Sequence, residues 1–250
     1  MNRLTEAWFE FKGVRSDSLG IMLAEMPQRT VAARNMARKK VAGRSGRIRH
    51  SDRSFDDIIL QLHFDARDES RLREIDAWLT GSGALRFSDD PDLDYDACIE
   101  ASPSRQSIRP RFGGQRYTVK FVCAPFKTLH TPADNIVKQA SGESFTNPGT
   151  APALSRVKIA GSGWFSVTIG MQTMWFTNVT DGGIIVDAQI GDVLTFDGAL
   201  LANDKASGEL FEIQPGSNTV SWLTGGSDDD GTTHQGSITS VTITPRWRYF

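Results

Sequence analysis

The second half of the chain contains repeated short runs in which apolar and polar residues alternate. From Val157 onward no helical period lasts beyond one turn. Alternation with period two is typical of strands with one buried face. Clusters of turn-forming residues separate the runs, among them Gly161-Ser162-Gly163, Asp181-Gly182-Gly183 and Asp228-Asp229-Asp230-Gly231. The alternating residues are Val157/Ile159, Phe165/Val167/Ile169, Ile184/Val186, Val193/Phe196, Phe211/Ile213, Val220/Trp222 and Val241/Ile243. These seven runs predict an antiparallel β-sandwich or jelly roll.

The first half predicts further strands and one helix. Period-two alternation runs along residues 58–64 and 118–123, and residues 8–11 and 18–23 predict shorter strands. Asp68 is the expected N-cap of the helix. Leu72, Ile75 and Leu79 form its apolar face, with Trp78 beside them, and Gly81 is the expected left-handed stop. We therefore expect a mainly β chain whose N-terminal β-sandwich carries one amphipathic helix and a projecting hairpin.

Charge changes sign near Thr131. Before it there are 22 Lys and Arg against 18 Asp and Glu, and from it onward 6 against 12, so the net charge of −2 hides a basic half and an acidic half. Prolines and glycines accumulate between residues 128 and 152, which predicts a linker or short extended pieces. We place two domains at 1–135 and 136–250.

Residues 29–53 form a basic segment in which Asp52 is the single acid. Its cations are Arg29, Arg34, Arg38, Lys39, Lys40, Arg44, Arg47, Arg49 and Arg53. Gly43 and Gly46 predict a turn there, because glycine adopts positive φ without strain. Phosphate binding is one interpretation, but the segment has no aromatic residue for base stacking and no nucleic-acid-binding motif. We favour an arm that docks on an acidic protein surface, with a solvated loop as the other alternative, and expect no specific nucleic-acid partner.

Residues 89–96 form an acidic segment. Asp90, Asp92, Asp94 and Asp96 have the spacing of the first ligands of a calcium loop. Tyr95 stands where that loop needs glycine, and the position of its bidentate glutamate holds alanine. An acidic turn that leads into a strand is the favoured interpretation, with adventitious Ca²⁺ binding as the alternative.

Motifs for catalysis or cofactor binding are missing from the sequence. The four histidines have no metal-ligand spacing, and Cys98 and Cys123 lie in strand-like patterns typical of buried free thiols. Glycine patterns for nucleotide loops or a nucleophile elbow are absent, and spacing alone does not test a pair of glycosidase carboxylates. We expect no enzyme, no metal and no cofactor. No run is apolar enough for a membrane helix, and residues 1–11 do not resemble a secretory signal, so membrane insertion is not expected.

Short motifs follow one another in a familiar order along nearly the whole chain. They include Phe9-Glu10-Phe11-Lys12-Gly13, Val41-Ala42-Gly43-Arg44-Ser45-Gly46, Trp78-Leu79-Thr80-Gly81, Asp89-Asp90-Pro91, Asn147-Pro148-Gly149, Pro215-Gly216-Ser217-Asn218 and Arg246-Trp247-Arg248. This collinear set resembles the distal tail protein family of long-tailed (siphovirus-type) bacteriophages or prophages. Ala42 and Ser45 depart from the proline and aspartate of that family's hairpin motif.

The resemblance implies a structural virion protein with a galectin-like antiparallel β-sandwich as its C-terminal domain. It implies a homo-oligomeric ring, expected to be a hexamer, that connects the tail tube protein to the tail-tip or baseplate proteins. In some relatives the C-terminal domains carry receptor-binding proteins. The implied location is the tail tip of the virion, after assembly in the cytoplasm of the bacterial host.

A ring requires two different complementary surfaces on each subunit. We assign one to the basic segment and the other to the acidic segment, because opposite charges steer assembly and fix register. The proposed subunit-interface residues are Arg38, Lys39, Lys40, Arg44, Arg47, Arg49, Asp89, Asp90, Asp92 and Asp94.

The alternative function is a carbohydrate-binding module that attaches to host cell-surface glycans. Trp164, Trp175, Trp222 and Trp247 are its candidate stacking residues, although large aromatic side chains are also typical of cores. The ordered polar set of sugar-binding galectins is not found in the sequence, so the fold analogy alone does not predict lectin activity.

Overall fold

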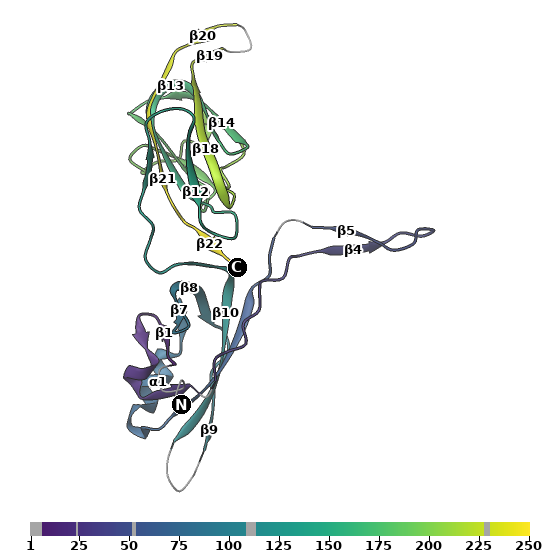
Figure 1. Ribbon diagram of the computed structural model, residues 1–250, viewed down its shortest axis with the longest axis vertical. Coiled ribbons are helices and arrows are strands. Elements are labelled where there is room, and N and C mark those ends of the chain that lie inside the picture. Colours follow the sequence, from purple (N-terminus) through teal and green to yellow (C-terminus); the bar gives the residue numbers. More distant parts are fainter. Residues whose placement is uncertain (1–6, 24, 52–53, 109–113, 228–230) are drawn as a thin grey trace. The chain divides into compact units, whose positions relative to one another are not determined.

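The computed structural model describes residues 7–23, 25–51, 54–108, 114–227 and 231–250. The chain divides into two compact units, Met1–His130 with Phe250 and Thr131–Tyr249. Antiparallel strands build both units (Figure 1), so the predicted mainly β fold is confirmed. The domain limits 1–135 and 136–250 stay a prediction. Among the described residues, none of the helices has the length and apolar character needed to cross a membrane.

The first unit is a curled antiparallel sheet with the strand order β2-β1-β7-β8-β10-β6-β3. The alternation predicted along residues 58–64 and 118–123 is confirmed, since every second side chain of β6 and of the middle of β10 is buried. The strands are β1 (Phe9–Phe11), β2 (Val14–Arg15), β3 (Ile21–Leu23), β6 (Ile58–Ala66), β7 (Gly81–Phe87), β8 (Asp90–Ile99), β9 (Ser104–Ser107) and β10 (Gln115–Leu129).

Aromatic side chains fill the core of the first unit. Phe9 stacks on Trp78 with ring centroids 5.4 Å apart, and Phe11 meets Phe121 edge-on at 5.1 Å. The Trp78 indole N–H donates to the Phe11 carbonyl oxygen at 2.9 Å, which satisfies the polar atom that burial would otherwise leave unpaired. These contacts join β1, β10 and the helix in one core.

The predicted helix is present but shorter than its pattern suggested. A 3₁₀ turn, η2 (Glu69–Arg71), leads into α1 (Leu72–Trp78). The Asp68 carboxylate caps the 3₁₀ turn by accepting from the Ser70 backbone N–H at 2.9 Å. Ile75 and Leu79 are fully buried, as expected. Gly81 has the predicted positive φ of 74°, but it begins β7, because the chain leaves the helix at Trp78.

Two other predictions for the first unit need correction. The strand expected along residues 18–23 is divided, because η1 (Ser16–Leu19) is a 3₁₀ turn that ends at Gly20, and only β3 follows it. The turn expected around residues 89–96 is tighter than predicted, because β8 already begins at Asp90 and pairs with β7.

The second unit is built around β13 (Arg156–Ile169), whose first half pairs with β15 and β21 and whose second half pairs with β14 and β18. The predicted sandwich strands are confirmed along most of this unit. The confirmed ones are β13, β15 (Gly183–Asp187), β16 (Asp192–Thr195), β18 (Gly216–Thr224) and β21 (Gly236–Thr244). The alternation did not predict β11 (Ile136–Lys138), β12 (Glu143–Asn147), β14 (Gln172–Val179), β17 (Ala206–Gly208) or the separate ribbon of β19 (Gly226–Ser227) and β20 (Thr233–His234). Arg248–Tyr249 form the short strand β22.

The structure corrects two expectations for the second unit. The cluster Gly161-Ser162-Gly163 is an irregularity inside the continuous strand β13, and the pairing register shifts on either side of it. Phe211 and Ile213 are buried as expected, but Ile213 makes a single bridge to Ala153 in place of a strand. The aspartates of the turn cluster at 228–230 lie outside the described residues.

Candidate functional site

The basic segment folds into a hairpin of its own. Strands β4 (Ala37–Lys40) and β5 (Arg47–His50) form a two-stranded sheet, and Figure 1 shows them reaching beyond the curled sheet of the first unit. The predicted glycine turn is confirmed, with φ of 77° at Gly43 and 82° at Gly46. All residues of both strands are exposed. The hairpin therefore meets solvent on both of its faces.

The register of the hairpin separates its charges. Arg38 lies opposite Arg49 and Lys40 opposite Arg47, so these four side chains share one face, which we call the cation face. The other face carries Ala37, Lys39, Ile48 and His50. Like charges directly across two strands destabilise a sheet. An external anionic surface would relieve this repulsion.

The cations of the hairpin have no ion-pair partner among the described residues of the chain. These cations are Arg38, Lys39, Lys40, Arg44, Arg47 and Arg49. Surface cations on a ribbon remain solvated at little cost, so their number alone does not define a site. Their placement on a protruding ribbon, exposed and without an ion pair to a described acid, suits contact with another molecule.

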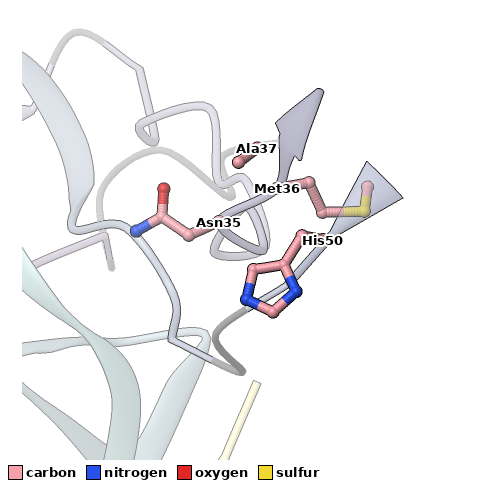
Figure 2. A pocket seen from close by; sticks show the side chains of 4 residues that line it. All are labelled: Asn35, Met36, Ala37 and His50. Atoms are coloured by element: carbon pink, nitrogen blue, oxygen red, sulfur yellow. The ribbon is translucent and has the colours of Figure 1, made fainter. Parts of the chain in front are cut away.

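An open depression of about 390 Å³ lies at the root of the hairpin. Figure 2 shows Met36 and His50 projecting where β4 begins and β5 ends, with Asn35 and Ala37 next to them. The Asn35 side-chain amide donates to the Ser54 hydroxyl at 3.1 Å, which holds the root in place. The described lining contains one histidine and neither an acid nor a nucleophile, so the depression suits packing rather than catalysis.

The acids of the acidic segment are largely paired within the chain. Arg29 binds Asp89, and the Lys127 ammonium lies 2.9 Å from an oxygen of Asp90. The Arg29 guanidinium also lies over the Phe87 ring, 4.7 Å from its centroid. Arg29 is thus the one member of the basic segment that meets the acidic segment within the described chain.

Asp94 belongs to a second group of paired charges. Its carboxylate lies 3.9 Å from the Arg86 guanidinium and 2.9 Å from Nδ1 of His130, while Arg86 binds Glu10 at 2.8 Å. Sequence reasoning missed Glu10, Arg86, Lys127 and His130 as partners of these acids. Strand register brings them together, and no local spacing in the sequence marks it.

Asp92 and Asp96 are the acids of the segment that stay exposed and make no ion pair with any described residue. The interface assignment of the basic and acidic segments stays a prediction. Within the acidic segment, these two carboxylates keep the largest capacity to bind a cation of another molecule.

The tryptophans singled out in the sequence belong to the second unit. Trp247 is buried, Trp222 is half-buried on β18, and Trp164 and Trp175 line one depression of the second unit. Among the described histidines, cysteines and acids, no group of three is arranged to hold a metal ion.

The two thiols are expected to react slowly in the folded chain. Burial raises the pKa of Cys123 to about 12, and burial together with the Glu100 carboxylate raises the pKa of Cys98. Because the thiolate is the reactive form, iodoacetamide at pH 8 should label half-buried Cys98 slowly and Cys123 only after unfolding. Mass spectrometry of timed samples, with a guanidinium-unfolded control, measures this. Rapid labelling of Cys123 in the native chain would contradict the assignment.

No family model and no curated protein matches the sequence. Among solved structures, the chain is similar to the Dit protein (gp 19.1) of phage SPP1, described as a paradigm of the hub adsorption apparatus in phages that infect Gram-positive bacteria. The match has a TM-score of 0.72 at 13% sequence identity and covers 98% of this chain and 99% of that chain. The resemblance noted in the sequence is thus confirmed at the level of the fold: across both units, the chain has the fold of a phage distal tail protein.

Proposed function

We propose that this chain is a structural protein of the distal tail of a siphovirus-type phage, where it forms a ring between the tail tube and the tail-tip or baseplate proteins. The observation that carries the proposal is the match to SPP1 Dit over nearly the full length of both chains. At 13% identity the match supports a shared fold, and the proposed role follows from that fold by analogy. The protruding hairpin adds a feature suited to assembly.

The proposed ring contact is made between neighbouring copies. Each copy would offer its cation face to acids of the next copy. Among those acids are Asp92 and Asp96, which form no ion pair with a described residue of their own chain. Such a contact is head-to-tail, since it joins two different surfaces, and repetition of one head-to-tail contact generates a ring when the rotation closes. Six copies are the expected number.

The other partners follow from the same role. The tail tube protein would bind one side of the ring and tail-tip or baseplate proteins the other, and the second unit is available for a receptor-binding protein. The protein would be assembled in the host cytoplasm and reside at the virion tail tip. The proposed role is structural and requires no enzymatic activity.

Negative-stain electron microscopy of the purified chain, alone and mixed with the tail tube protein of the same phage, tests the proposal. Rings with six-fold symmetry are expected in at least the mixture. Particles of monomer size in both samples would contradict it. Immunogold labelling of intact virions would then show whether the chain is at the tail tip at all.

A further inference from the structure

A shallow depression in the second unit has an aromatic lining without charge. Its volume is about 190 Å³. Trp175 is 57% exposed, which is unusually high for an indole side chain. Phe165 and Phe176 belong to the core beneath it. The described lining residues are Trp164, Phe165, Trp175, Phe176, Thr177, Gly225, Gly226 and Ser227.

Strand register defines the surface beside Trp175. Trp175 on β14 lies opposite Ser166 on β13, and Ser166 lies opposite Leu223 on β18. Since Phe165 and Val167 point into the core, this row lies on the outer face of the sheet. Ser166 is nevertheless 4% exposed, whereas Leu223 is 71% exposed. The outer face thus presents an indole and an aliphatic side chain on either side of a covered hydroxyl.

Trp164 is held in place at the end of the same surface. Its indole N–H donates to the side-chain oxygen of Asn178 at 3.1 Å, and its ring stacks on His234 at 4.0 Å between centroids. Asn178 has a φ of 50°, a left-handed conformation that is uncommon outside glycine. The pairing register between β13 and β14 also shifts at this point. Register shifts are frequent next to binding sites.

Close backbone packing fixes the same corner. A Cβ atom on Gly236 would lie 1.7 Å from the Trp164 carbonyl oxygen, and one on Gly163 would lie 2.2 Å from the Gln235 carbonyl oxygen. Neither contact could be relieved by a side-chain movement, because both partners are backbone atoms. The position of Trp164 therefore depends on glycine at both sites, and the aromatic wall is preformed.

The chemistry of this surface indicates the ligand. No described lining residue carries a charge, so none of them offers an ion pair in return for the hydration that a charged ligand would lose. An exposed indole face packs well against the C–H face of a sugar ring, and the hydroxyls of Thr177 and Ser227 are suited to the ring hydroxyls. We propose that the Trp164–Trp175 depression is a binding site for a neutral pyranose, with Trp175 as its stacking residue.

The dimensions favour a sugar over a protein partner. The volume of about 190 Å³ has room for little more than one sugar ring. The depression would by itself supply only a small part of the roughly 800 Å² that a stable protein interface buries on each side. Preformed concave sites that combine aromatic rings with a few polar groups are typical of small-molecule binding. A second copy of the chain is the competing occupant, and the experiment separates the two.

Saturation-transfer NMR and tryptophan-fluorescence titration of the full-length chain test the site. The probes are glucose, galactose and N-acetylglucosamine, with acyclic glycerol as the control. At least one pyranose is expected to saturate the site with a Kd on the order of 1 mM, and glycerol is not. If none of the three sugars saturates, the proposal is overturned.

Variants assign any binding to the depression. Trp175→Ala should weaken binding at least tenfold and Trp175→Phe should retain part of it, while Leu200→Ala, another exposed apolar position of this unit outside the lining, should bind as the wild type does. Circular dichroism confirms folding of each variant. Wild-type binding by Trp175→Ala would overturn the proposal. So would sugar-free sedimentation in which the wild type self-associates and Trp175→Ala does not, because a second copy would then occupy the surface.

Discussion

Replacing Arg47 and Arg49 with glutamate is expected to weaken ring assembly while each chain stays folded. The two changes leave two cations and two anions on the cation face, so the face becomes neutral and loses its attraction for a neighbouring acidic surface. Both side chains are exposed, so the free energy of unfolding should change by less than about 0.5 kcal/mol. Sedimentation velocity at physiological ionic strength measures assembly, and the concentration required for it should rise at least about tenfold.

A matched variant controls for net charge. Arg73→Glu with Lys120→Glu changes the charge by the same amount, but both side chains are exposed outside the hairpin, Arg73 on α1 and Lys120 on β10. This control should assemble like the wild type. Equal weakening of both variants would assign the effect to net charge, and unchanged sedimentation of the Arg47/Arg49 variant would refute the assigned interface. High salt should weaken wild-type assembly, because it screens exposed charges.

Replacing Arg246 with methionine is expected to destabilise the second unit by about 3–5 kcal/mol at neutral pH, because it leaves a buried carboxylate without its cation. The Asp187 side chain is 2% exposed, and the Arg246 guanidinium binds both of its oxygens, at 2.5 and 3.0 Å. The backbone N–H groups of Gln189 and Ile190 also donate to this carboxylate, but they do not neutralise it. Urea unfolding monitored by tryptophan fluorescence measures the difference.

The pH dependence tests the reason for this effect. Burial alone would raise the pKa of Asp187, but the hydrogen bonds and charge of Arg246, with the two backbone N–H groups, hold the pKa below its ordinary value of 3.8. The pair therefore stabilises the wild type above that value, and the contribution is lost as pH falls through the lower folded-state pKa. In Arg246→Met the effect of burial prevails, so the buried Asp187 carboxyl group is more readily protonated. The difference in free energy of unfolding between the variant and the wild type should therefore narrow toward acid pH.

Lys205→Met controls for the loss of one cation from the same unit. Lys205 is half-exposed and donates to the Thr180 hydroxyl at 3.2 Å. Its removal therefore leaves no buried carboxylate without a cation. Its stability should stay within about 0.5 kcal/mol of the wild type. A similar loss in both variants would show that the buried pair is not the cause. A gap for Arg246→Met that is constant with pH would exclude the proposed charge mechanism.

Local patterns in the sequence were enough to predict several of the strands and the helix start. The alternation along β6 and β10 survives because one face of each strand packs on the core and the other does not. Asp68 caps its helix as predicted, because that hydrogen bond spans two residues and needs no tertiary contact. The helix end was misplaced, since Leu79 and Gly81 serve the core and the next strand after the chain has left the helix.

The ion pairs could not be predicted in the same way. Arg86 and Glu10 are 76 residues apart, and Lys127 and Asp90 are 37 apart. Each pair depends on the order and register of strands, which a run of charges does not encode. The acidic segment therefore looked like one free patch in the sequence, whereas most of its carboxylates have partners inside the fold.

By itself, the sequence determined the mainly β composition of both units, the capped helix and the basic hairpin with its glycine turn, because each depends on residues close together in the chain. Tertiary structure alone decided that four cations share one face of the hairpin, that Asp187 meets Arg246 from 59 residues away, and that Trp164 and Trp175 border one depression. The physical reason is that pairing register and strand bends determine which side chains become neighbours, and both emerge only when the whole sheet has closed around its core.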